Sequence, residues 1–209
     1  MINSKAVFLI GYSGHSFVIC DIFLSKNIEI KGYFENVQKI RNPYELAYFG
    51  NENDKKNLEL LKETDYFVAI GSNIVRSIIT QKIKARLNKM PINAIHNSAS
   101  ISSTVVLGKG IMVGDGAIVN ACVELADGVI CNTQSVVEHE SKIGAFSHIA
   151  PGAILCGNVK VGRQTFIGAR AVIKQGVTIG DNVIIGAGTV IIKDIPSNSK
   201  VVGNPQKFI

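Results

Sequence analysis

Residues 143–191 read IGAFSHIAPGAILCGNVKVGRQTFIGARAVIKQGVTIGDNVIIGAGTVI, and one pattern recurs in them every six residues. An aliphatic residue opens each group of six, glycine often follows it, and a small or branched residue stands four positions after it. Along the chain the apolar position is filled seventeen times in succession, at Ile95, Ile101, Leu107, Val113, Val119, Leu125, Cys131, Val137, Ile143, Ile149, Leu155, Val161, Ile167, Ile173, Ile179, Ile185 and Ile191. At an apolar content of 46%, chance would produce this with a probability on the order of one in a million.

A period of six fits neither an α-helix nor a long strand, whose periods are 3.6 and 2, but it fits a short strand and a corner repeated in turn. Each group of six then forms one side of a prism with its apolar residue inside. No group can bury that residue alone, so the stack needs a cap at each end. We expect the residues before the repeat to cap one end and the tail after Ile192 to cap the other.

The first part of the chain has a different composition, because five of the 20 glycines precede residue 90 and the other 15 follow it. We therefore expect two domains, residues 1–90 and residues 91–209. Apolar runs in the first domain predict strands at 6–10, 30–34 and 66–70, and helical patterns predict helices at 17–25, 57–62 and 74–88. Strands that alternate with helices indicate a small α/β unit with a parallel sheet.

Composition excludes several classes of protein. The net charge is +6, but no run of lysine and arginine alternates with aromatic residues, so nucleic acid is not an expected partner. The apolar stretch 6–10 is too short for a membrane span or a signal peptide core, so we expect a cytoplasmic protein that does not bind membranes. The cysteines Cys20, Cys122, Cys131 and Cys156 form no C-x-x-C pair and lie in apolar segments, which predicts buried free thiols rather than disulfides or a metal site.

Four segments carry a resemblance to a known family: GYSGHS at 11–16, AIGSN at 69–73, residues 132–140, and VGNP at 202–205. With them the whole chain resembles the hexapeptide-repeat acyltransferases. More narrowly, it is similar to the sialic acid O-acetyltransferase and nucleotide-amino-sugar N-acetyltransferase family, which includes bacillosamine and perosamine N-acetyltransferases. The resemblance implies a Rossmann-like α/β domain followed by a left-handed parallel β-helix. It also implies a homotrimer with active sites between adjacent subunits, acetyl-CoA as co-substrate, no metal, and a UDP-linked 4-amino-4,6-dideoxy sugar as acceptor.

The loop that contains Gly11, Ser13, Gly14 and His15 stands between a predicted strand and a predicted helix. Backbone N–H groups and the helix dipole favour an anion there, although a tight turn that merely needs glycine would give the same pattern. The resemblance implies that this loop and His15 hold the diphosphate of the nucleotide sugar.

Further candidates for the same pocket follow the other strands. The family often has two aspartates after the second strand, where this chain has Glu35 and Asn36, so the preferred nucleobase is open. Gly71 and Asn73 follow the third strand and are expected to line the pocket, because ligands of open parallel sheets lie beyond the carboxyl ends of the strands. Alternatively, Asn73 only caps the next helix.

His139 and Glu140 are the candidate catalytic residues. Counting in sixes points Val137 inward, so His139 and Glu140 fall at a corner and point outward together. A carboxylate bonded to one ring nitrogen fixes the tautomer and raises the basicity of the other nitrogen, although a histidine on a repeat surface is often inert. The resemblance implies that His139 is the general base and Glu140 its partner. It also places Asn132 near the acceptor sugar, where a simple turn residue is the alternative.

The expected reaction is direct transfer from acetyl-CoA to the sugar amine, without a covalent intermediate. A route through a cysteine is a minor alternative, because no cysteine has a neighbouring base in the sequence and Cys131 is predicted to point inward.

His148 follows His139 by nine residues, which is half of an 18-residue coil, so the two side chains lie on opposite sides of one prism. The resemblance implies that His148 touches acetyl-CoA, and the two histidines can then share a site only if they come from adjacent subunits. An exposed strand residue without a role is the alternative.

Residues 156–209 carry a net charge of +5 and residues 91–155 a net charge of −3. We expect the polyanionic coenzyme to lie near the basic coils, with Lys174 and Lys193 as contacts, although a merely solvated surface has the same charge. Gly157, Ala169 and Ala187 match family positions where small residues let the backbone meet the pantetheine arm.

Three rival functions remain open from the sequence. The first is O-acetylation of a sialic acid, or N-acetylation of a GDP-linked sugar such as perosamine. The second is a metal-dependent enzyme of the carbonic anhydrase type, which needs three histidine ligands where only His139 and His148 are well placed. The third is a scaffold without catalysis.

Overall fold

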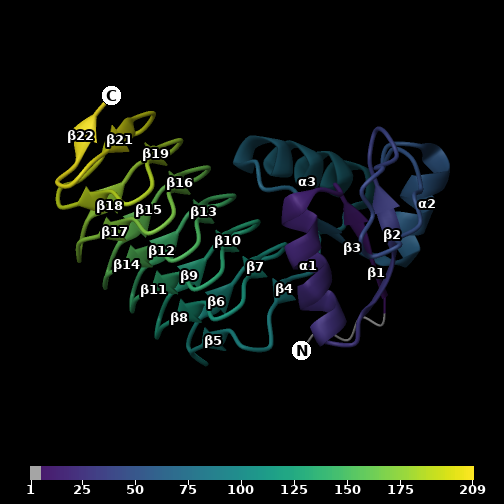
Figure 1. The fold of residues 1–209 in the computed structure, drawn as a ribbon, viewed down its shortest axis with the longest axis horizontal. Helices are drawn as coiled ribbons and strands as arrows, with labels where there is room; N and C mark the ends of the chain where they lie inside the picture. The colour runs from purple at the N-terminus through teal and green to yellow at the C-terminus, as the bar shows by residue number, and fades with distance from the viewer. Residues whose placement is uncertain (1–5) are drawn as a thin grey trace. The chain divides into compact units, whose positions relative to one another are not determined.

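The computed structural model describes residues 6–209. The chain divides into two compact units, and the boundary along the sequence lies between Asn97 and Ser98 (Figure 1). The first unit is an α/β structure, and the second consists of short strands wound into successive coils. No helix in the described part of the chain is long and apolar enough to cross a membrane.

The first unit is built on a three-stranded parallel sheet in the order β2-β1-β3. Its strands are β1 (Ala6–Ile10), β2 (Glu29–Phe34) and β3 (Asp65–Val68), and its helices are α1 (Gly14–Ser25), α2 (Lys55–Glu63) and α3 (Asn73–Leu87). The short strand β4 (Ala94–Ile95) follows them in the chain and is not part of this sheet. Each predicted strand and helix is present, so the prediction of a parallel α/β unit is confirmed. Its core includes a cluster in which Phe8, Phe34 and Tyr66 are buried.

Several boundaries differ from the prediction, and two of these differences have clear local reasons. Helix α1 begins at Gly14, three residues before the apolar pattern, because Ser16 bonds both the N–H and the carbonyl of Ser13 and closes the first turn. Strand β3 ends at Val68 rather than at residue 70, because the chain turns there toward the Ser72 cap of α3.

The second unit is a parallel β-helix with three faces, each a ladder of two-residue strands. Face 1 contains β7 (Met112–Val113), β10 (Ile130–Cys131), β13 (His148–Ile149), β16 (Phe166–Ile167), β19 (Ile184–Ile185) and β21 (Lys200–Val202). Face 2 contains β5 (Ser100–Ile101), β8 (Ile118–Val119), β11 (Val136–Val137), β14 (Ile154–Leu155), β17 (Val172–Ile173) and β20 (Val190–Ile191). Face 3 contains β6 (Val106–Leu107), β9 (Glu124–Leu125), β12 (Lys142–Ile143), β15 (Lys160–Val161) and β18 (Thr178–Ile179).

The predicted apolar position is the second residue of each strand. From Val113 to Ile191 these side chains are buried, and each pairs with the one 18 residues away in the next coil, as Cys131 does with Ile149. The first residue of each strand therefore points outward. This alternation points the side chain of His148 to the outward side of face 1, although only 7% of the residue is exposed.

The corners explain the rest of the six-residue pattern. One residue per corner has a positive φ, and these residues recur every six positions from Gly110 to Gly188. The glycine after the inward residue has a different cause: a Cβ on Gly144 would lie 2.6 Å from the backbone of Gly162 and Arg163 in the next coil. Glycine there allows the coils to stack closely.

The tail after Ile192 leaves the six-residue pattern and closes the last coil, as predicted. Strand β21 pairs in parallel with β19, and β22 (Lys207–Phe208) returns antiparallel to β21.

All four cysteines are free, but the prediction that all are buried is wrong. Cys20 and Cys131 are buried, and burial raises the pKa of each thiol to about 12. Cys156 is half-buried, whereas Cys122 is exposed because it occupies the left-handed position of a corner. Cys131 points inward as predicted, so its thiol is no candidate nucleophile.

Candidate functional site

The predicted nucleotide-binding residues gather at the carboxyl ends of β1, β2 and β3 in the first unit. Gly11 ends β1 with φ +89°, and a Cβ there would lie 2.5 Å from Cγ1 of Ile70. Only glycine therefore lets the loop after β1 pack on the loop after β3. Gly14 begins α1, and no atom lies within 4 Å of the position its Cβ would take. This helix N-terminus can accept an anion.

His15 lies in the first turn of α1 and packs against the loop after β3. A Cβ on Gly71 would lie 3.7 Å from Cγ of His15, so the ring rests beside the backbone of Gly71. Burial, together with a smaller effect of the positive charge of the nearby Arg76, lowers the pKa of His15 to about 4. The imidazole is therefore neutral at neutral pH and acts through its hydrogen bonds rather than through charge.

Arg76 anchors the loop after β3 from within the unit. Its guanidinium is 1% exposed and donates to the carbonyls of Ile70 and Gly71, at 3.1 and 3.0 Å, and to Oδ1 of Asn73 at 2.9 Å. Burial lowers the pKa of Arg76 to about 9. The alternative that Asn73 caps α3 is wrong, because Ser72 is the cap and its Oγ accepts from the Val75 N–H at 3.5 Å.

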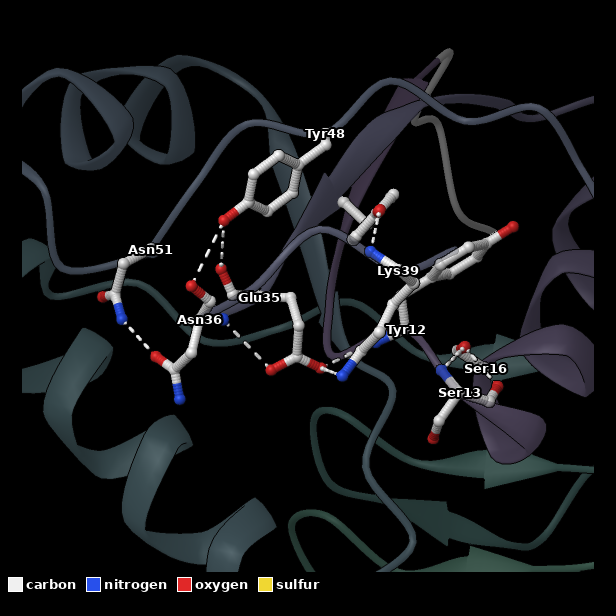
Figure 2. Close-up of polar contacts among 9 residues, drawn as sticks. Tyr12, Ser13, Ser16, Glu35, Asn36, Lys39, Tyr48 and Asn51 are labelled. Carbon is white, nitrogen blue, oxygen red and sulfur yellow. Dashed lines mark hydrogen bonds and ion pairs between the residues drawn. The ribbon is translucent and has the colours of Figure 1, made fainter. Parts of the chain in front are cut away.

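Glu35 and Asn36 follow β2 directly and lie beside the loop after β1 (Figure 2). One carboxylate oxygen of Glu35 accepts from the N–H of Asn36 at 3.1 Å, and the other accepts from the N–H of Tyr12 at 3.4 Å and pairs with Lys39 at 3.4 Å. Tyr48 donates its hydroxyl to the carbonyls of both residues, at 3.2 and 3.3 Å. Glu35 thus joins the ends of β1 and β2.

The predicted catalytic pair lies at the corner between faces 2 and 3, after β11. Nδ1 of His139 lies 3.1 Å from Oε2 of Glu140, and the two side chains are 51% and 66% exposed. A Cβ on Gly157, one coil further on, would lie 2.5 Å from Nε2 of His139. The imidazole therefore lies directly over Gly157. With Nδ1–H donated to the carboxylate, the lone pair of Nε2 is available as a base.

His148 lies on face 1 and is held by Asn132 rather than by His139. Oδ1 of Asn132 accepts from the N–H of Thr133 at 2.8 Å, which turns Nδ2 toward Nε2 of His148 at 3.1 Å. The amide donates, so Nε2 accepts, and the proton of the neutral ring resides on Nδ1. Phe166 packs edge-on against this ring, with centroids 5.1 Å apart.

The predicted coenzyme contacts divide between two corners of the β-helix. Gly157 and Lys193 stand one and three coils beyond His139 in the same corner column, and Lys174 lies beside that column. Ala169 and Ala187 lie in the corner column between faces 1 and 2, after β16 and β19. The chain alone does not bring these two sets together.

A groove of about 680 Å³ runs along the outer surface of face 3. Outward side chains of successive strands line it, together with the glycines that follow them, including Glu124, Lys142, Lys160, Thr178, Gly144 and Gly162. Lys142 pairs with Glu124 at 2.7 Å, whereas Lys160 has no ion-pair partner in the part of the chain that the structure describes. The corner of His139 leads directly into this face at β12.

No group of three histidine, cysteine, aspartate or glutamate residues between residues 6 and 209 is arranged to hold a metal ion. Sequence analysis also missed Arg76 and the lysines of the groove. The groove lysines could have been predicted, because Glu124, Lys142 and Lys160 are spaced 18 residues apart and therefore lie at the same outward position in successive coils.

Comparisons with known proteins agree with both units. Residues 6–83 match the PglD N-terminal domain, and residues 158–193 match bacterial transferase hexapeptide repeats. The acetyltransferase domain of PglB from Neisseria gonorrhoeae FA1090, in complex with acetyl coenzyme A, is 33% identical with a TM-score of 0.91, and the match covers 99% of this chain and 100% of that one. PerB from Caulobacter crescentus, in complex with CoA and GDP-perosamine, is 32% identical with a TM-score of 0.89, and the match covers 100% of this chain and 98% of that one.

A curated relative, the uncharacterized protein L142 of Acanthamoeba polyphaga mimivirus, is 33% identical over 126 residues. The match covers 59% of this chain, which spans about a quarter of that relative's length.

The fold and these matches first define a class, the acyltransferases that join a PglD N-terminal domain to hexapeptide repeats. Within that class, the chain belongs to the same family as PerB and the acetyltransferase domain of PglB. The predicted fold class is confirmed.

Proposed function

We propose that this protein transfers an acetyl group from acetyl-CoA to the amino group of a nucleotide-linked sugar, a UDP-linked 4-amino-4,6-dideoxy sugar in the first instance. The observation that carries the proposal is the His139–Glu140 pair, with Nδ1 bonded to the carboxylate at 3.1 Å and Nε2 lying over Gly157. Support comes from the PglB domain, which binds acetyl coenzyme A, and from PerB, which binds CoA and GDP-perosamine. We place the enzyme in the cytoplasm, as the sequence predicts.

In the proposed reaction, the sugar amine attacks the thioester carbonyl carbon of acetyl-CoA. Nε2 of His139 takes a proton from the amine nitrogen as the C–N bond forms, and backbone N–H groups stabilise the oxyanion. The C–S bond then breaks, and the proton on His139 passes to the departing thiolate of CoA. Glu140 holds the imidazole in the required tautomer and stabilises the imidazolium that forms between these steps.

A site that uses both His139 and His148 needs two copies of the chain, because the two side chains lie on different faces of one β-helix. We propose a homotrimer in which face 2 is the contact between copies. From β8 to β20 its outward residues form an uninterrupted apolar ladder, at Ile118, Val136, Ile154, Val172 and Val190. Ile118 and Ile154 remain 37% and 39% exposed within one chain. A ladder of this kind is typical of a surface that is buried on assembly.

In this arrangement acetyl-CoA lies along the groove of face 3 of one copy, opposite the His148 face of its neighbour. Lys142 and Lys160 line the groove, and a polyanion is attracted to such an edge. Lys174 and Lys193 border the same corner in later coils, whereas Ala169 and Ala187 would come from the neighbouring copy. The nucleotide diphosphate would lie at the N-terminus of α1. There the neutral His15 contributes a hydrogen bond.

Two alternatives stay within the same chemistry. PerB, at 32% identity, binds GDP-perosamine, so a GDP-linked acceptor is the first alternative. O-acetylation of a sialic acid is the second, and it would use the same donor and base without the loop of the first unit that we assign to a nucleotide.

The test is thiol release from acetyl-CoA by the purified protein with UDP- and GDP-linked 4-amino sugars and with sialic acid, alongside His139→Ala. Turnover with a nucleotide sugar that falls at least about a thousandfold in His139→Ala supports the proposal. Turnover with sialic acid alone, or unchanged turnover in His139→Ala, overturns it. Ala at this exposed position costs little stability, so thermal unfolding of the variant serves as the control.

A further inference from the structure

Asn36 ends a directed chain of side-chain hydrogen bonds that begins at Arg86 of α3 and crosses the loop after β2. Nη1 of Arg86 donates to Oδ1 of Asn53 at 3.1 Å, and Nδ2 of Asn53 donates to Oδ1 of Asn51 at 2.8 Å. Nδ2 of Asn51 then donates to Oδ1 of Asn36 at 2.6 Å (Figure 2). Every bond in the chain therefore points from Arg86 toward Asn36.

The direction of these bonds is fixed independently of how any amide is drawn. The backbone N–H of Asn53 donates to Oδ1 of Asn51 at 2.8 Å, and a backbone N–H can only donate. The other end of the Asn51 amide must then be Nδ2, so the atom of Asn36 that faces it must be the oxygen. Successive hydrogen bonds that point in the same direction also polarise one another, which strengthens the preference for this orientation of the amides.

The consequence is that Asn36 presents its amide nitrogen, not its oxygen. Nδ2 has no hydrogen-bond acceptor among the described residues, and Figure 2 shows it directed away from Asn51. The backbone beneath it is held by Tyr48, whose hydroxyl donates to the carbonyls of Glu35 and Asn36. The position thus offers an oriented hydrogen-bond donor at the end of β2.

The end of the second strand is where an α/β nucleotide site meets the nucleoside, with an acidic residue on the ribose hydroxyls. Glu35 occupies that place here, and Asn36 is the next residue along the chain. We infer that the Asn51–Asn36 pair makes this site selective for a pyrimidine dione, uracil or thymine, by donating to a ring carbonyl oxygen. This inference rests on the proposed function, because it assumes that a nucleotide binds at the end of β2.

The chemistry of the bases supplies the reason. Uracil and thymine present two carbonyl oxygens on either side of one N–H, whereas guanine presents one carbonyl oxygen, O6, and two neighbouring donors, N1–H and the N2 amino group. A donor at residue 36 can pair with either carbonyl of the diones, whereas on guanine it can pair only with O6 and opposes the two donors. A carboxylate at the same position would accept both guanine donors, and an aspartate would therefore favour guanine.

The closing experiment measures binding of UDP, dTDP, GDP and CDP to the full chain by calorimetry, with no acetyl transfer involved. We expect UDP and dTDP to bind at least about tenfold more tightly than GDP, because an opposed polar pair costs roughly that much. In Asn51→Asp, residue 51 still accepts from the Asn53 N–H but now also accepts from Nδ2 of Asn36. The Asn36 amide is then reversed, and the UDP-to-GDP preference falls about tenfold or inverts.

Two variants separate orientation from charge. Gln38→Glu adds the same negative charge two residues from Asn36 without touching the chain of amides, so it should leave the preference unchanged. Asn51→Ala frees the Asn36 amide to rotate, and the preference should shrink to an intermediate value.

The inference is overturned if GDP binds the wild type as tightly as UDP, or if Asn51→Asp and Gln38→Glu change the preference equally, and the proposed function would survive either result. Failure of all four nucleotides to bind would instead overturn the nucleotide-sugar acceptor itself, and the inference with it.

Discussion

The substitution Gly157→Ala tests the geometry of the catalytic corner. The new methyl group would lie 2.5 Å from both Nε2 and Cε1 of His139, whereas ordinary contacts between such atoms are about 3.5 Å. The imidazole must therefore move by about 1 Å, and displacement of a catalytic group by that distance costs on the order of a hundredfold in rate. We expect kcat to fall by that factor, with the KM values for both substrates within about threefold of wild type.

The control is a double-mutant cycle with His139→Ala, measured by thiol release and by thermal unfolding. Without the imidazole there is nothing for the methyl group to displace, so Gly157→Ala should have no further effect in the His139→Ala background. The reasoning is refuted if Gly157→Ala lowers stability equally in both backgrounds, or if kcat is unchanged. A raised KM for acetyl-CoA at unchanged kcat would show that Gly157 serves the pantetheine arm, as the family resemblance implies.

Two further predictions concern acid stability and assembly. The pKa of His15 falls from 6.5 to about 4 on folding, so the unfolded chain takes up the proton first as the pH drops. Neutral His15 therefore contributes up to about 3 kcal/mol of stability above pH 6.5, and this contribution is lost as the pH falls toward 4. Between pH 7.5 and pH 4.5 the free energy of unfolding, measured with urea, should therefore fall by about 2 to 3 kcal/mol less in His15→Gln than in the wild type. An equal fall in both proteins would contradict a lowered pKa of His15. Ile154→Asp places an unpaired charge in the middle of face 2 and should convert trimers to monomers in sedimentation experiments at micromolar concentration, whereas Val106→Asp on face 3 should not. A trimeric Ile154→Asp would rule out face 2 as the contact.

The architecture of the second unit could be predicted from the spacing of its apolar residues. Its seventeen apolar positions recur at a period that only a stack of short strands and corners can bury, so the inward set, including Cys131, could be read directly from the spacing. The strands and helices of the first unit were also predictable, because each buries a continuous or periodic apolar run. The same counting placed His139 and Glu140 at a corner and His148 on another side of the prism, as the structure has them.

The contacts between polar groups, in contrast, could not be predicted and are seen only in the folded chain. Gly157 lies against His139 because successive coils stack 18 residues apart, and the sequence gives no sign that a glycine is needed there for an imidazole rather than for a ligand. Arg76 and the chain from Arg86 to Asn36 join loops that are distant in sequence and follow no period. The physical reason is that apolar burial is set by the residue's own place in a repeating element, whereas a hydrogen bond depends on the position and direction of a second group, which the folded chain alone supplies.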